Sequence, residues 1–172
     1  MRTRIVLAAL CLAGCASAPS NLSGERIAAI VASPERNDAD RKNDERRKPA
    51  ETLGFIGVRE GMVALDVSAG GGYTTELIAR AVGPTGRVYG QTRAPDPRNR
   101  LALRKMANIV PVVRPFEDPA PPDVALDLVT LMFNYHDFGH MGVDRAKLNA
   151  AVFKALKPGG LYIVADHSGR PE

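Results

Sequence analysis

The sequence has little cysteine, no long apolar run and no strong excess of one charge. Its 172 residues include only two cysteines, too few for a disulfide scaffold. No run approaches the ~20 apolar residues that span a bilayer. The net charge of +4 is mild, and both signs are mixed along the chain, which does not favour a nucleic-acid partner. The apolar share of 45% and the charged share of 24% are those of a globular protein, and the length predicts one domain.

The first fifteen residues predict export from the cytosol. Two arginines within the first four residues precede the apolar segment Ile5–Ala13, as in a secretory signal. Leu12–Cys15 resembles the bacterial lipobox, which predicts a signal peptide over residues 1–14 and lipidation of Cys15. Ala16–Ala18 offers an ordinary cleavage site as an alternative, and an uncleaved cytosolic start is the third possibility.

The predicted lipoprotein belongs in the outer membrane, facing the periplasm, because no aspartate follows Cys15 to indicate retention in the inner membrane. A soluble periplasmic protein is the alternative. Without residues 1–14 the chain has 21 basic and 19 acidic residues, a net charge of +2. Cys11 would leave with the signal peptide and Cys15 would carry the lipid, so no free thiol would remain, which suits an oxidising compartment. Residues 15–33 are expected to form a tether and a short helix, and residues 34–172 the folded domain.

Short apolar strands alternate with helical patterns along the rest of the chain. The predicted strands are 62–67, 87–91, 109–114, 125–133 and 161–165. The predicted helices are 25–31, 50–58, 73–82, 97–107 and 143–156. The charge-rich segment 36–48 is expected to form a solvated helix face, capped at Ser33. Alternating strands and helices predict an α/β fold with a doubly wound, Rossmann-like sheet.

The segment Val63–Tyr73 joins the first of these strands to a glycine-rich turn. Gly70–Gly72 lack side chains that would keep a ligand away from the main chain. In doubly wound folds, ligands bind beyond the carboxyl ends of the strands. The dinucleotide fingerprint G-x-G-x-x-G is not matched, because Thr75 stands at its last glycine. Asp66 also precedes the glycines, which is unfavourable for a pyrophosphate.

Four segments resemble class I S-adenosylmethionine-dependent methyltransferases. The acid and glycine turn of 63–73 are similar to the first motif of this family. Residues 86–90, 127–129 and 156–161 are similar to its second strand, the start of its fourth strand and the turn into its fifth. Asn134–Asp137 (Asn-Tyr-His-Asp) resembles a segment of exported bacterial predicted methyltransferases. The resemblance implies S-adenosylmethionine as cofactor and a small molecule as methyl acceptor.

The resemblance also implies which residues bind the cofactor. Asp66 would organise the turn and face the positive end of the cofactor, whose tail and ribose would lie on the main chain. Glu117 or Asp118 would accept a hydrogen bond from the adenine amino group. The expected cofactor-binding residues are Asp66, Ser68, Gly70, Gly72, Gln91, Glu117, Asp118 and Asn134.

Two residues depart from the pattern of the family. Ser68 stands where the motif has its first glycine, which is tolerable only if the main chain there does not need a positive φ. Gln91 stands where an acid grips the ribose hydroxyls, and its missing charge predicts binding weaker by ~1–2 kcal/mol. Export also separates the protein from a cofactor made in the cytosol. These points favour the alternative, a non-catalytic, lipid-anchored binding module that keeps the fold. The intact Gly70–Gly72 and the segment Asn134–Asp137 favour the leading expectation, an S-adenosylmethionine-dependent methyltransferase.

The three histidines lie near the ends of the last two predicted strands. His136 and His140 are four residues apart, and His167 follows the fifth strand. A polar site on the substrate side, with Tyr135, His136 and Asp137 as catalytic candidates, is one interpretation. Helix capping and loop hydrogen bonds are the second. A metal site is the third, weakened by the glycine that precedes His140.

The resembled fold has two more strands after the fifth, whereas this chain stops at Glu172. We therefore expect an incomplete C-terminus. The strand predicted over 161–165 would then be an apolar sheet edge, open to self-association. Another chain that covers this edge is the alternative.

Overall fold

The computed structural model describes residues 21–168. The helices are α1 Gly24–Val31, α2 Asp38–Arg47, α3 Pro49–Ile56, α4 Tyr73–Val82, the 3-10 turn η1 Ala102–Arg104, α5 Tyr135–His140 and α6 Arg145–Ala155. The strands are β1 Val63–Val67, β2 Arg87–Thr92, β3 Ile109–Val113, β4 Leu126–Met132 and β5 Leu156–Ala165. Within this part of the chain, no helix combines the length and the apolar character needed to cross a membrane.

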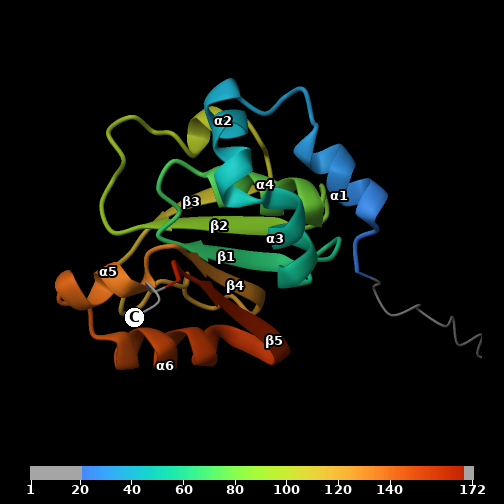
Figure 1. The fold of residues 1–172 in the computed structure, drawn as a ribbon. Helices are drawn as coiled ribbons and strands as arrows, with labels where there is room; N and C mark the ends of the chain where they lie inside the picture. Colours follow the sequence, from blue (N-terminus) through green and yellow to red (C-terminus); the bar gives the residue numbers. More distant parts are fainter. Residues whose placement is uncertain (1–20, 169–172) are drawn as a thin grey trace, which may run out of the picture.

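All five strands are parallel and lie in the order β3-β2-β1-β4-β5, as Figure 1 shows. The chain first moves from β1 to β3 in one direction and then crosses back to β4 on the other side of β1. The predicted doubly wound α/β fold is therefore confirmed. The order reverses between β1 and β4, so the carboxyl ends of these two strands mark the place where such folds bind ligands.

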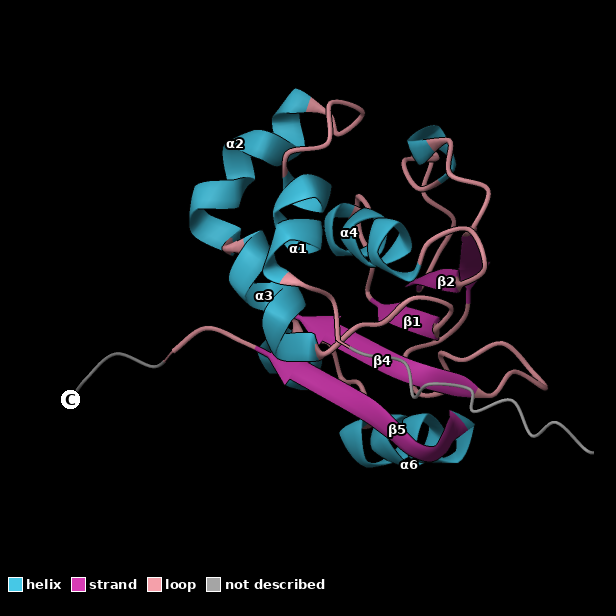
Figure 2. Ribbon diagram, turned by 90° about the vertical axis from the view of Figure 1, so that its right-hand side faces the viewer, coloured by secondary structure: helices cyan, strands magenta, loops and turns pink. Residues whose placement is uncertain are grey.

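Helices cover both faces of the sheet, with α1, α3 and α4 on one side and α6 on the other (Figure 2). The first side holds an apolar cluster that includes Ile30, Leu53, Leu77 and Ile78. The second cluster includes Leu65, Leu131, Phe138, Leu148 and Val152. Because successive residues of β1 point to opposite faces, Ala64 joins the first cluster while Leu65 joins the second.

Several element boundaries follow the predicted ones closely. α4 spans Tyr73–Val82 as predicted, and α3 begins with Pro49 in its first turn, where a missing N–H costs nothing. β5 starts at Leu156, five residues before the predicted strand, because Leu156 already pairs with Leu126; residues 157–160 then bulge out before pairing resumes at Leu161 with Leu128.

Three expectations about the N-terminal half and the β2–β3 connection are wrong. Residues 97–107 do not form an α-helix, since Asn99 and Lys105 adopt positive φ angles and only the short η1 lies there. Helix α2 begins after Asn37, whose side chain caps it, rather than at Ser33. The charge-rich segment is also not simply solvated: Arg36 is 3% exposed and Asp40 is 8% exposed.

The predicted signal peptide, residues 1–14, and the predicted lipid site, Cys15, lie outside the described residues. Helix α1 is described and packs through Ile27 and Ile30 on α3 and α4. At the other end, β5 forms one edge of the described sheet, and the side chains of Leu161 and Val164 are about two-fifths exposed.

Candidate active site

The turn between β1 and α4 exposes main chain at one glycine. Gly70 has a φ of +55°, and a Cβ there would meet only the Ser68 carbonyl, at 3.9 Å. Gly72, with a φ of +84°, differs, because its Cβ would lie 2.8 Å from Leu101. Gly72 is thus required for close packing of the chain on itself, whereas Gly70 leaves the main chain accessible to a ligand.

The ends of the two neighbouring strands β1 and β4 are both strained. Ser68, just after β1, has a φ of +58°, and Phe133, just after β4, has a φ of +64°. Positive φ is unfavourable for residues other than glycine, above all for a bulky one, and such strain gathers at functional sites. The Asn134 amide donates to the Ser68 hydroxyl at 3.1 Å and joins the two ends. Ser68 therefore does need a positive φ, the case in which its replacement of glycine carries a cost.

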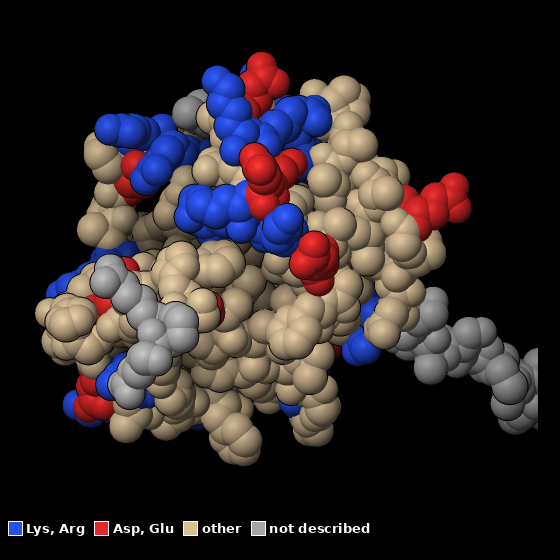
Figure 3. Space-filling model, in the orientation of Figure 1, with Lys and Arg blue, Asp and Glu red and all other residues tan. Residues whose placement is uncertain are grey.

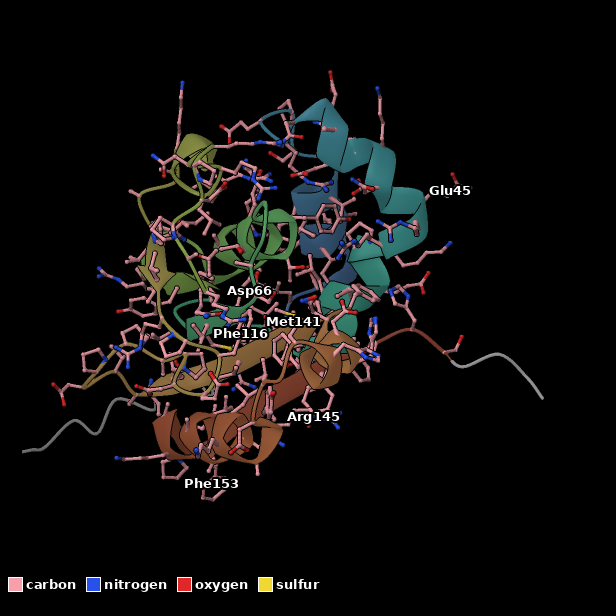
Figure 4. All side chains as sticks on the ribbon, turned by 90° about the vertical axis from the view of Figure 1, so that its left-hand side faces the viewer. Glu45, Asp66, Phe116, Met141, Arg145 and Phe153 are labelled. Atoms are coloured by element: carbon pink, nitrogen blue, oxygen red, sulfur yellow. The ribbon has the colours of Figure 1, made fainter. Side chains whose placement is uncertain are left out.

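Asp66 lies beneath this turn and is fully buried, near the centre of the view in Figure 4. Its carboxylate accepts hydrogen bonds from Thr75 at 2.6 Å and from Thr130 at 2.9 Å. Burial raises the pKa of Asp66 to about 6, although both bonds act in the other direction. The carboxylate faces α4 and β4, so it organises the turn. Asp66 was expected to face the positive end of the cofactor directly, and its carboxylate does not do so in this geometry.

Gln91 is also buried under the turn and does not present its side chain to a ligand. Its Oε1 accepts from the Ser68 N–H at 2.9 Å, and its Nε2 donates to the Arg114 carbonyl at 2.6 Å. Both ends of the amide are thus engaged by main chain. The expected hydrogen bond from Gln91 to a ribose hydroxyl is corrected: this residue holds the glycine turn on β3.

The two acids after β3 are engaged by their own neighbours. Glu117 accepts from the Asp144 N–H at 3.3 Å, at the start of α6. Asp118 forms an ion pair with Arg114. Phe116, which is labelled in Figure 4, is buried against Phe138 with 4.5 Å between ring centroids. Among the described residues, Glu117 and Asp118 therefore already have partners other than an adenine.

His136 is held by the chain end that follows β5. Its Nδ1 lies 2.6 Å from Asp166 Oδ1, and its main-chain N–H donates to the other oxygen of Asp166 at 2.8 Å. Its Nε2 lies 3.2 Å from Asp137. Partial burial alone would raise the pKa of Asp166, but the hydrogen bonds from His167 and His136 outweigh it and lower that pKa. The side chain of His136 is half-exposed, so it can meet a ligand.

Tyr135 faces away from the turn. Its hydroxyl accepts from Asn149 at 3.2 Å, and Arg145 lies 5.3 Å from its ring centroid. Both partners belong to α6, so the structure does not bring Tyr135 together with His136 and Asp137 at the turn. The pairing of β4 with β5 sets the position of Asp166 beside His136.

Charged side chains form the outer wall of the turn. Arg104 binds Asp40 of α2, Glu76 of α4 at 2.6 Å and the Gly71 carbonyl at 3.1 Å. Figure 3 shows Lys and Arg gathered over α2 and over the connection after β2. A cavity of about 300 Å³ lies beside this wall, lined by Asp40, Gly71, Arg100 and Arg104 among others. Arg47, at the end of α2, is one more cation of this region and was not among the predicted site residues.

The order of the strands defines a doubly wound α/β domain, and the glycine turn after β1 and the strained strand ends mark a candidate ligand site at its carboxyl edge. Residues 65–164 match the family described as "Methyltransferase domain". The chain belongs to this family. The predicted resemblance to class I S-adenosylmethionine-dependent methyltransferases is therefore confirmed in family and fold.

Two relatives show how far the similarity extends. The "Ubiquinone/menaquinone biosynthesis C-methyltransferase UbiE" of Enterobacter sp. (strain 638) is 31% identical over 123 residues, which are 68% of this chain and 47% of that protein. The protein of the same name from Marinomonas sp. (strain MWYL1) is 30% identical over 126 residues, 70% of this chain and 48% of that protein. The chain thus spans about half the length of the curated relatives it matches.

Solved structures agree with the fold. A SAM dependent methyltransferase from Aquifex aeolicus has a TM-score of 0.65 at 19% identity, covering 88% of this chain and 77% of that one. Aeropyrum pernix fibrillarin, solved with natively bound S-adenosyl-L-methionine, has a TM-score of 0.51 at 22% identity, covering 62% of this chain and 46% of that one. S-adenosylmethionine is accordingly the cofactor of this class of domain.

Proposed function

We propose that this protein transfers a methyl group from S-adenosylmethionine to a small-molecule acceptor at the carboxyl edge of β1 and β4. The observation that carries the proposal is the pair of strained residues, Ser68 and Phe133, joined across that edge by Asn134. The similarity to ubiquinone/menaquinone biosynthesis C-methyltransferases supports a small-molecule acceptor and favours an enzyme over a non-catalytic binding module.

The residues around the turn fit such a cofactor. The accessible main chain at Gly70 allows a nucleoside and its tail to lie close to the turn. Asn134, already oriented by Ser68, has a carbonyl oxygen left to accept a hydrogen bond. When bound, the cofactor supplies a methyl group on a positively charged sulfur. The chain supplies position, which is the main requirement for an in-line methyl transfer.

His136 is the group we assign to the acceptor. If the acceptor is a hydroxyl compound, the cofactor would supply the methyl group and the hydroxyl oxygen that takes it would lose its proton. That proton would pass to Nε2 of His136 when the hydroxyl takes the place of the Asp137 carboxylate, which lies 3.2 Å from this nitrogen. Asp166, bonded to Nδ1, then balances the imidazolium charge and keeps the ring in place.

Calorimetry with S-adenosylmethionine tests the binding part of this proposal. We expect saturable binding that Asn134→Leu weakens, whereas Asn149→Leu, on exposed α6, leaves it unchanged. Absence of binding to the wild type at millimolar cofactor would end the enzyme hypothesis.

Release of S-adenosylhomocysteine with a panel of phenols and quinols tests the chemistry. His136→Gln should lower turnover by about 10²–10⁴-fold, the usual range for a general base, and should keep cofactor affinity. His140→Gln, at the far end of the same short helix, is the matched control. Equal turnover in the two variants would remove His136 from the mechanism.

A further inference from the structure

Among the described residues, no acid forms an ion pair with the guanidinium of Arg47. Its guanidinium carbon lies 5.3 Å from the Tyr73 ring centroid and 4.9 Å from the Phe133 ring centroid. Between residues 21 and 168, no hydrogen bond or ion pair reaches this guanidinium, although rings on two elements hold it. Burial, and then the neighbouring Arg46, lower the pKa of Arg47, which shows that the charge is partly desolvated.

The nearby acids have other partners. Asp44 receives both terminal nitrogens of Arg36, at 2.7 and 2.8 Å, and the Tyr73 hydroxyl at 2.7 Å. Asp66 feels the charge of Arg47 but gives its oxygens to two threonine hydroxyls. Arg47 therefore keeps its donors available for an anion that comes from outside the chain.

The position of Arg47 is set by the two loops of the candidate site. Tyr73 directly follows Gly72 of the glycine turn and opens α4. Phe133 directly precedes Asn134 and has the strained φ of +64°. Since the guanidinium lies over both rings, it lies between the two loops that meet at the Ser68–Asn134 bond.

A guanidinium backed by aromatic rings is well suited to bind a carboxylate, because its flat fork of N–H groups matches the two oxygens. S-adenosylmethionine carries one carboxylate, at the end of its amino-acid tail. On the ribose side, the amide of Gln91 is engaged by main chain. This position therefore offers a ribose hydroxyl neither a carboxylate nor a free amide group.

We propose that Arg47, held between Tyr73 and Phe133, binds the carboxylate of the cofactor's amino-acid tail and that this pair is the main charged anchor of the cofactor. This inference rests on the proposed function, because it places the cofactor at the same turn. It predicts that affinity depends on the tail more than on the ribose.

Two ligands that differ in the tail test this. S-adenosylhomocysteine has the amino-acid tail, and 5′-methylthioadenosine has the same nucleoside and thioether sulfur without it. Calorimetry would compare wild type, Arg47→Gln and the control Arg46→Gln, which removes the same charge one residue earlier. We expect Arg47→Gln to weaken S-adenosylhomocysteine binding about 10- to 100-fold, the size of a charge-assisted hydrogen bond, and to leave 5′-methylthioadenosine within about twofold.

Each result decides the matter. Unchanged S-adenosylhomocysteine affinity in Arg47→Gln overturns the inference and leaves the proposed function standing. An equal loss for both ligands also overturns it, since Arg47 would then only support the fold. An equal loss of affinity in Arg46→Gln would also overturn it, because the effect would then come from the net charge of this region and not from Arg47 itself. If the wild type binds neither ligand, the proposed function itself fails.

Discussion

The buried carboxyl of Asp66 makes stability depend on pH in a direction opposite to that of most carboxylates. Its pKa is raised from the ordinary 3.8 to about 6 by burial, because the charged form is disfavoured away from water. The folded protein therefore binds the Asp66 proton more tightly than the unfolded chain does. The stability from this group is fully present below about pH 4 and is lost as the pH rises through about 6.

The size of the effect follows from the same two values. At ~1.4 kcal/mol for each tenfold change in proton affinity, the difference corresponds to about 3 kcal/mol. Asp66→Asn keeps the shape and removes the titration; its amide oxygen can accept from one of the two threonine hydroxyls while its NH2 donates to the other, as a protonated carboxyl would. The stability of wild type relative to this variant should fall by about 2–2.5 kcal/mol between pH 4 and pH 7, most of the full difference.

Urea unfolding of both proteins at pH 4, 5, 6 and 7 measures this difference. Every other titrating group is common to the two proteins, so its contribution cancels in the comparison. A stability difference that stays constant over this range would refute the reasoning about Asp66. A difference that grows in favour of the wild type as the pH rises would mean that its pKa is lowered instead.

Three further results are expected. Gln91→Leu leaves the Ser68 N–H and the Arg114 carbonyl without the side chain that pairs them in the interior. It should lower the free energy of unfolding in urea titrations by about 2–4 kcal/mol. An unchanged urea midpoint would count against the role assigned to Gln91. The double change Leu161→Lys and Val164→Lys should reduce self-association through the β5 edge, which light scattering after gel filtration would report; a wild type that is already monomeric and monodisperse contradicts the expectation. Cys15→Ser should abolish incorporation of labelled palmitate in cells, and equal labelling of both proteins would exclude the predicted lipid site.

Hydrophobic periodicity was sufficient for the sheet and for the helices that cover it. The helix over residues 73–82 matches its prediction at both ends, because a glycine turn precedes it and Gly83 follows it. Alternating strands and helices limit the fold to a few topologies, and the structure shows which strand order is taken. These features depend on local pattern, and local pattern is what a single sequence contains.

The errors have two origins, one in long-range pairing and one in a local side-chain cap. Residues 36–48 look like a solvated charged face, but Arg104, 64 residues from Asp40, draws that acid into the interior. The segment 97–107 has a proline near its start, as a helix would, yet Asp96 binds the N–H groups of Arg98 and Arg100 and forms a turn instead.

The candidate site could be proposed from motifs, but its contacts could not. The motifs singled out the glycine turn, Asn134 and His136, whereas the strained φ of Phe133 has no signature in the sequence. Arg47 looks like its charged neighbours until the structure shows two rings beneath it. The role of Asp166 depends on which strand lies beside β4.

The bonds made by Arg104 tie together segments that are far apart in the chain. The side chain connects an N-terminal helix, the glycine turn and the irregular connection after β2, and none of these can take its final position alone. They should therefore open and close as one cooperative unit, distinct from the sheet. If α2 is loosened, the amides of the connection after β2 should also exchange faster. A change at the surface of α2 would then alter the candidate cofactor site without any change in the strands.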